Sequence, residues 1–186
     1  MSDDHEHNHS HENEHDHDHD HQHHHHDIDN PDVAVVTVSS SRTLEDDPAG
    51  DAIESVLEAE DHSVVTRDTV TDDHDAIQLW VDEYADDSQI DAIVTTGGTG
   101  ITPDDVTVEA VSALFSKDLP GFGELFRQLS YEEIGTRVVG TRATAGVVNA
   151  VPVFCLPGSE NAARLGSEII ASEVSHLAGL AGRTND

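Results

Sequence analysis

Residues 91–107 read DAIVTTGGTGITPDDVT, a short apolar run followed by three glycines within four positions. The apolar run predicts a buried strand over 91–95. Thr102 and Pro103 suit the N-cap and the first position of a helix, which we expect over 102–115. A loop that joins a parallel strand to a helix lies at the carboxyl edge of the sheet, where open α/β folds bind their ligands.

The glycines of this loop suit a phosphate group. Glycine permits positive φ and lets a ligand approach bare N–H groups, and a helix start adds unpaired N–H groups with a favourable dipole. A tight turn that binds nothing is the alternative interpretation. The loop is neither a P-loop, because no Gly-Lys-Ser/Thr follows, nor the dinucleotide fingerprint, because its glycine spacing differs.

Acidic residues follow two of the expected strands. Asp105 comes after the glycine loop, and Asp72 and Asp73 come after the strand expected over 63–70. Carboxylates beside a phosphate site suit Mg²⁺, which takes one or two acidic ligands plus phosphate oxygens and water. Asp105 also stands three positions after Thr102, so it could instead be only a capping acid.

Strand and helix patterns alternate along the rest of the chain. Strands are expected over 33–38, 63–70, 91–95, 138–141 and 151–156, and helices over 47–59, 72–85, 102–115, 121–134 and 159–180, with a turn region at 146–150. This alternation predicts an α/β fold with three layers, α/β/α, around a mainly parallel sheet. We expect it to form one domain over residues 33–186.

Residues 1–32 have a different composition. They hold 12 of the 15 histidines and 11 of the 39 acidic residues, and no lysine or arginine. Such a segment buries too little apolar surface to offset its ordering entropy, so we expect a disordered tail. A metal buffer or delivery arm for Zn, Ni or Cu, a solubilising tail and a cloning remnant are its three interpretations.

The whole chain has a formal net charge of −31, and about −20 remains without the tail, from 28 acidic and 8 basic residues. This charge argues against nucleic acid or an anionic membrane as partner. It favours a protein of a high-salt cytoplasm, with an ordinary acidic cytosolic protein as the alternative. The single Cys155 excludes an internal disulfide, and no signal or membrane-spanning pattern is visible, so we expect a cytoplasmic protein.

Five blocks of sequence resemble one known family. They are the glycine loop with its following acid at 95–107, PGFGE at 120–124, SYEEIGT at 130–136, RATAGV at 142–147 and LPGS at 156–159. In this order they are similar to the molybdenum cofactor biosynthesis proteins of the MoaB/MogA type. The resemblance covers nearly all of residues 33–170.

The resemblance implies a molybdopterin adenylyltransferase, which transfers AMP from ATP to the terminal phosphate of molybdopterin with Mg²⁺ and releases pyrophosphate. Asp72 and Asp105 match the family's catalytic, metal-binding acids. The implied binding residues are Ser39, Gly97, Gly98, Thr99, Gly100, Gly121, Phe122, Gly123, Glu124, Arg142, Pro157, Gly158 and Ser159. The resemblance further implies a trimer or hexamer and a molybdenum-insertion enzyme as possible partner. A non-catalytic molybdopterin carrier or scaffold is the alternative.

Overall fold

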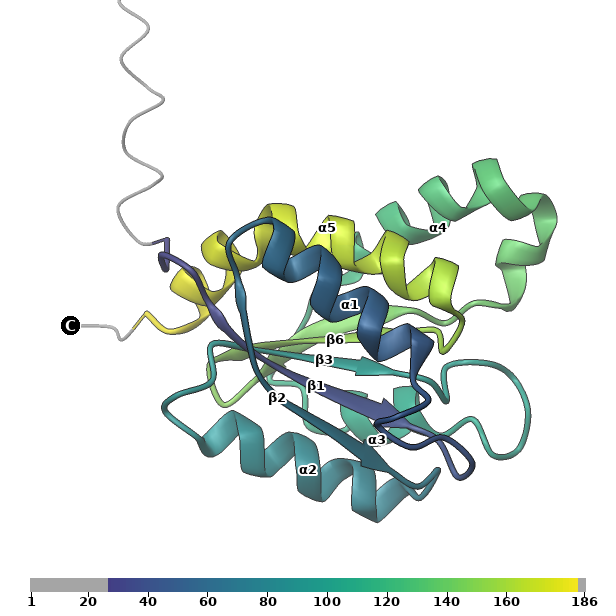
Figure 1. The fold of residues 1–186 in the computed structure, drawn as a ribbon, viewed down its shortest axis with the longest axis horizontal. Helices are drawn as coiled ribbons and strands as arrows, with labels where there is room; N and C mark the ends of the chain where they lie inside the picture. The colour runs from purple at the N-terminus through teal and green to yellow at the C-terminus, as the bar shows by residue number, and fades with distance from the viewer. Residues whose placement is uncertain (1–26, 184–186) are drawn as a thin grey trace, which may run out of the picture.

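A computed structural model of the protein describes residues 27–183, which form a six-stranded sheet between two layers of helices (Figure 1). The strands are β1 (Asp32–Val38), β2 (Ser63–Val70), β3 (Ala92–Thr96), β4 (Lys117–Asp118), β5 (Thr144–Val148) and β6 (Val151–Leu156). Their order is β2-β1-β3-β6-β5-β4. Strands β2, β1, β3 and β6 are parallel, while β5 and β4 extend the sheet in antiparallel pairings. The predicted three-layer, mainly parallel architecture is confirmed.

Helices cover both faces of the sheet. They are α1 (Pro48–Ala59), α2 (His74–Asp86), α3 (Thr107–Ser112), α4 (Pro120–Ile134), the 3-10 helix η2 (Gly135–Gly140) and α5 (Glu160–Ala181). Helices α1, α4 and α5 lie on one face and α2 and α3 on the other (Figure 1). No helix in the stretch from residue 27 to residue 183 is both long enough and apolar enough to span a membrane.

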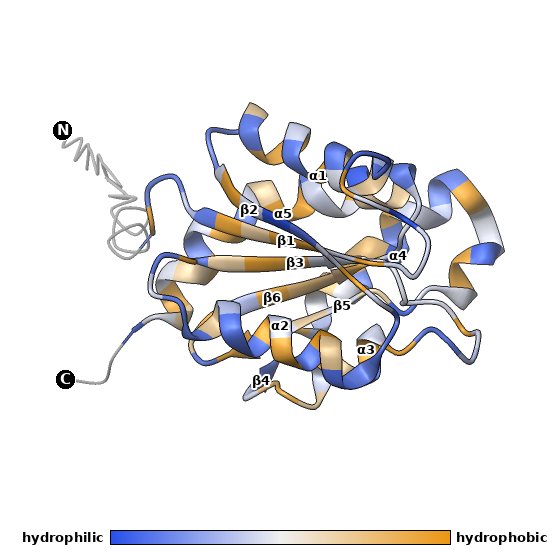
Figure 2. Cartoon of the chain, turned by 60° about the horizontal axis from the view of Figure 1, so that its bottom comes forward, coloured by the Kyte–Doolittle hydropathy of each residue, from blue (hydrophilic) through white to orange (hydrophobic). Residues whose placement is uncertain are grey.

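Strand β1 contributes to the packing of both faces. Val33 and Val35 pack with α1, α4 and α5, whereas Ala34, Val36 and Val38 pack with α2 and α3. A strand buried on both faces needs a continuous apolar run, which explains the β-branched segment that the sequence shows there. Figure 2 shows hydrophobic residues along the central strands and a mixture of hydrophilic and hydrophobic residues along the helices.

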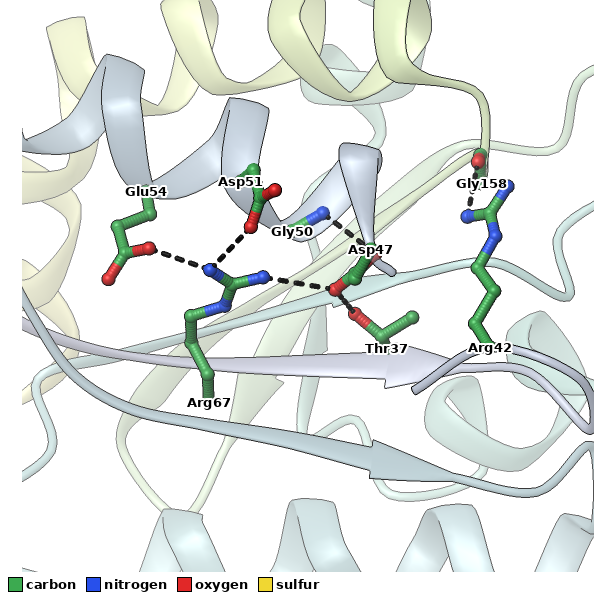
Figure 3. A network of polar contacts seen from close by, with 8 residues as sticks. All are labelled: Thr37, Arg42, Asp47, Gly50, Asp51, Glu54, Arg67 and Gly158. Atoms are coloured by element: carbon green, nitrogen blue, oxygen red, sulfur yellow. Dashed lines mark hydrogen bonds and ion pairs between the residues drawn. The ribbon is translucent and has the colours of Figure 1, made fainter. Parts of the chain in front are cut away.

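A polar network, buried at Thr37 and Asp47 and open to solvent at Asp51, ties α1 to the sheet (Figure 3). Asp47 caps α1 by accepting the N–H of Gly50 at 3.0 Å, and its other oxygen accepts from Thr37 Oγ1 at 2.5 Å. Arg67 on β2 pairs with that oxygen at 3.2 Å and with two further acids of α1, Asp51 and Glu54. The network fixes the start of α1 over the carboxyl half of β1, next to the loops that follow the strands.

The helix expected over 102–115 is shorter than predicted, because α3 begins only at Thr107. A local turn replaces its first part. The N–H of Asp105 binds the carbonyl of Thr102 at 3.0 Å, and the Asp105 carboxylate accepts the Thr102 N–H at 2.7 Å and its hydroxyl at 2.6 Å. Such side-chain bonds to the backbone compete with a helix.

The prediction of a strand over 138–141 is also wrong. These residues belong mostly to the 3-10 helix η2, and the strand β5 follows at Thr144–Val148. The turn expected over 146–150 is confined to Asn149 and Ala150, whose φ angles are 46° and 70°. Two positive φ angles in a two-residue loop form the tight turn that joins antiparallel strands, so β5 and β6 are a hairpin.

Candidate functional site

A cavity of about 730 Å³ opens at the carboxyl edge of the sheet, where the loops after β1, β3 and β6 meet. In Figure 1 the arrowheads of β1 and β3 point toward these loops. The cavity is lined by Val38, Ser39, Ser41, Arg42, Gly97, Gly98, Thr99, Gly100, Asp105, Arg137, Gly140, Thr141, Pro157, Gly158 and Ser159. This place in the fold is where open α/β proteins bind ligands.

Glycines allow the three loops to pack backbone against backbone. Gly97 and Gly98 have φ of +104° and +62°, which residues with a side chain rarely adopt. A Cβ atom on Gly97 would overlap the carbonyl oxygen of Val38, and one on Gly158 would lie 3.1 Å from the Cα of Gly97. Gly97, Gly98, Thr99 and Gly100 all line the cavity, and the N–H of Gly97 donates to the carbonyl oxygen of Leu156 at 3.0 Å.

Asp105 is the carboxylate that lines this cavity. The hydroxyl of Thr102 lowers its pKa most, burial opposes the effect, and the N–H groups of Thr102 and Gly100 and the charge of Arg142 lower it further. The side chain is therefore anionic at neutral pH. It does not cap a helix, because the residue before α3 is Val106 and makes no side-chain capping bond.

Asp72 and Asp73 reach the same edge of the sheet but have different roles. Asp73 caps α2 by accepting the N–H of Ala76 at 2.9 Å. Asp72 accepts the N–H of Ser40 at 2.7 Å and thereby holds the loop that follows β1. It is not among the residues that line the cavity. Ser39, on the same loop, does line it and accepts the N–H of Arg42 at 3.1 Å.

Arg142 lies behind the glycine loop and is not among the lining residues. Its guanidinium donates to the carbonyl oxygens of Gly100 at 2.7 Å and Asp105 at 3.0 Å, and it forms an ion pair with Glu109. These three contacts use the planar fork of donors that arginine offers. In this structure Arg142 holds the loop that carries Asp105 in place.

The PGFGE block forms the first turn of α4 and does not line the cavity. Phe122 is buried and its ring lies 5.2 Å from that of Phe154, in an edge-to-face contact. A Cβ on Gly123 would lie 2.6 Å from the carbonyl oxygen of Ala143, so this glycine serves close packing. Gly121 and Glu124 are exposed.

Sequence reasoning missed the two cations of the cavity. Arg42 and Arg137 both line it, from the loop after β1 and from η2. Arg42 could have been noticed, because the whole chain has only eight basic residues. It also directly follows the serines at 39–41, which form the loop after the first strand. No such signal marked Arg137, because the residues that follow it, 138–141, were expected to form a strand of the sheet.

The described residues hold no group of three or more histidine, cysteine, aspartate or glutamate side chains placed to bind a metal. Mg²⁺ needs no such group, because it takes one or two carboxylates and fills its other positions with phosphate oxygens and water. The anionic Asp105 at the cavity wall suits this limited role.

The three-layer fold and the glycine-lined cavity define an α/β protein with a cavity at the carboxyl ends of its strands, the place where open α/β folds bind ligands. Residues 34–176 match the family model described as "Probable molybdopterin binding domain", and the chain belongs to this family.

Several proteins of known name are similar to this chain. It is 46% identical over 145 residues to the molybdenum cofactor biosynthesis protein B of Bacillus subtilis (strain 168), over 77% of this chain and 85% of that protein. A crystal structure of a molybdenum cofactor biosynthesis protein B has a TM-score of 0.80 at 39% identity, covering 84% and 99% of the two chains. The tungsten cofactor synthesizing protein MoaB from Pyrococcus furiosus has a TM-score of 0.73 at 41% identity, covering 82% and 98%.

Proposed function

We propose that the protein acts in molybdenum cofactor biosynthesis and transfers AMP from ATP to the terminal phosphate of molybdopterin, releasing pyrophosphate. The cavity at the carboxyl edge carries this proposal, because the glycine loop and the anionic Asp105 line one space of about 730 Å³. The names of the relatives support the pathway, and the family description supports molybdopterin as ligand.

The main task of the protein in this reaction is to position the molybdopterin phosphate and ATP. The phosphate of molybdopterin is already an anionic nucleophile, so one of its oxygens attacks the α-phosphorus of ATP directly. A new P–O–P linkage forms as the bond from the α-phosphorus to the bridging oxygen breaks, and pyrophosphate leaves with the electron pair. Holding both substrates in line supplies much of the rate enhancement. The N–H groups of Gly98 and Thr99 suit the binding of these phosphates, whereas those of Gly97 and Gly100 already donate to the carbonyl oxygen of Leu156 and to the Asp105 carboxylate.

Mg²⁺ would be held by Asp105 and by phosphate oxygens, with Asp72 as the second candidate ligand. The ion supplies neutralisation of the charge that develops on the phosphates. Asp105 faces the cavity, whereas Asp72 reaches this edge through its bond to Ser40. In this structure Asp72 holds the loop over residues 39–41 through its bond to Ser40.

A carrier or scaffold for molybdopterin is the second candidate function. The position of Asp72 favours it, because only one of the two acids lines the cavity. A carrier needs the glycine-lined walls but no pair of metal-binding carboxylates.

Incubation of the protein with molybdopterin, ATP and Mg²⁺ distinguishes the two functions. The adenylyltransferase forms adenylylated pterin and pyrophosphate in equal amounts, over many turnovers. A carrier binds one molybdopterin per site and leaves ATP intact. Binding without product would contradict the proposed reaction and support the carrier, and omission of Mg²⁺ is the matched control.

A further inference from the structure

Two arginines differ from the other basic residues because they form no ion pair among the described residues and also line the cavity. All eight lysines and arginines lie between residues 27 and 183. Arg67, Arg142 and Arg164 form ion pairs with carboxylates. The other five form none with any residue of this described part, although acids outnumber bases several-fold, and two of these five are Arg42 and Arg137. Both of these unpaired cations line the same cavity.

Arg42 is held in a fixed place by backbone contacts. One Nη atom donates to the carbonyl oxygen of Gly158 at 2.8 Å, as Figure 3 shows, and its backbone N–H binds Ser39 Oγ at 3.1 Å. This position joins the loop after β1 to the loop after β6, beside Gly97. Arginine has five N–H donors, so one bond to Gly158 leaves the others for a ligand.

Arg137 stands on another wall of the cavity. It belongs to η2, which lines the space through Arg137 and Gly140, and its side chain is exposed. Shortly after η2, Arg142 binds the carbonyls of Gly100 and Asp105, so the η2 wall adjoins the loop that carries Asp105. The two unpaired arginines thus approach the cavity from different loops.

The charge of these two arginines attracts an anionic ligand to the cavity. A net charge of −31 repels an anionic ligand overall, and cations that are not paired with acids reduce this repulsion locally. Arginine also matches phosphate oxygens with two parallel N–H donors, which gives stronger binding than a neutral contact. Pairing with acids, as in Arg67, would remove this attraction.

We propose that Arg42 and Arg137 bind the phosphate of the substrate in this cavity, with Arg42 as the main anchor because its side chain is half-buried and already oriented. The identity of the phosphate compound, molybdopterin, rests on the proposed function, whereas the presence of an anion site does not. Arg137, which is exposed and on a short 3-10 helix, makes the weaker and more salt-sensitive contact.

Titration of molybdopterin without ATP or Mg²⁺ tests the anchor directly. We expect Arg42→Gln to weaken binding by about 10- to 100-fold, as the loss of a charge-assisted hydrogen bond does. Arg137→Gln should weaken it by about threefold to tenfold, with the larger change at low salt. Lys117→Gln on the exposed β4 strand is the matched control, and its affinity should stay within about twofold of wild type.

Arg42→Lys separates charge from geometry, since it keeps the cation and loses the planar fork. It should recover only part of the lost affinity. If Arg42→Gln does not fold, as judged by its thermal unfolding, Arg42→Lys and Arg137→Gln decide the matter alone. Affinity within about twofold of wild type in the folded arginine variants would overturn the proposal.

The same titration separates the anion site from the proposed reaction. If the wild type binds molybdopterin but makes no adenylylated product, the transfer reaction fails while the arginine result still stands. If it binds no molybdopterin, titration with inorganic pyrophosphate replaces that measurement. Pyrophosphate binding that Arg42→Gln weakens would support the anion site, and absence of binding to either compound would overturn it.

Discussion

Gly97 shows how strongly one residue constrains the site. Its φ is +104°, and a Cβ atom there would overlap the carbonyl oxygen of Val38. We expect Gly97→Ala to lower the free energy of unfolding by at least about 2 kcal/mol, from backbone strain and displacement of the loop. Chemical denaturation measures the change.

Gly121→Ala is the matched control for this prediction, because a Cβ there would meet no atom within 4 Å. It should leave the free energy of unfolding unchanged or raise it by up to about 1 kcal/mol, since alanine favours helix. Equal losses in the two variants would contradict the assigned strain at Gly97.

Cys155 is fully buried in β6, and burial raises its pKa to about 12. Burial disfavours the charged thiolate, so at about pH 8 only about one thiol in ten thousand is ionised. We expect iodoacetamide to leave the folded protein unmodified and to alkylate Cys155 after unfolding in guanidinium chloride. Mass spectrometry provides the measurement, and rapid alkylation of the native protein would refute the burial.

The residues of the site were only partly predictable. The glycine loop and Asp105 follow from local sequence, because a loop after a parallel strand must lie at one edge of the sheet. The contacts of Arg142 join it to Gly100, which lies 42 positions away, and no local pattern reveals such a pairing. Arg42 and Arg137 were missed for the same reason.

At the scale of elements, the β5–β6 hairpin turns on Asn149 and Ala150 with positive φ. Asparagine tolerates this conformation and alanine does not, so Ala150 stores strain. We expect Ala150→Gly to stabilise the protein by about 0.5–1 kcal/mol. Ala59→Gly at the exposed end of α1 should instead destabilise it, and thermal unfolding compares the two variants. Destabilisation by Ala150→Gly would contradict this interpretation of the turn.

Elements with long apolar patterns were predicted well. The bounds of β2 and β6 match those expected, and α1, α4 and α5 begin and end within about two residues of them. The strands β4 and β5 were not expected, and the other main errors lie at 102–106 and 138–141. At 102–106 the Asp105 side chain accepts the backbone N–H of Thr102, and a turn forms in place of the helix. At 138–141 the β-branched pair Val138 and Val139 belongs to a 3-10 helix. The periodicity of apolar residues alone predicts neither the turn at 102–106 nor the 3-10 helix at 138–141.

The whole molecule carries an excess of negative charge that should make its stability depend on salt. With a net charge of −31, self-repulsion opposes the compact state, and the screening length falls from about 10 Å at 0.1 M salt to about 3 Å at 1 M. We expect the free energy of unfolding to rise with KCl over this range. Denaturation in urea, which is uncharged, measures it, and stability that is unchanged or falls with salt would contradict the expectation.

We propose that AMP transfer takes place in the cavity and depends on the carboxylate of Asp105. The neighbouring Asp104 is exposed and does not line the cavity, so it offers the same charge change one position away. Substitution of either aspartate by asparagine keeps the size of the side chain. In the Asp105→Asn variant, the side-chain carbonyl oxygen could still accept the hydrogen bonds that Thr102 donates.

The decisive measurement is therefore the rate of adenylylated molybdopterin formation by Asp105→Asn and Asp104→Asn, each with ATP and Mg²⁺ and each checked for native thermal unfolding. We predict a rate lower by at least about 100-fold for Asp105→Asn and one within about twofold of wild type for Asp104→Asn. A folded Asp105→Asn variant that keeps more than about half of the wild-type rate would contradict the proposed role of Asp105 in AMP transfer.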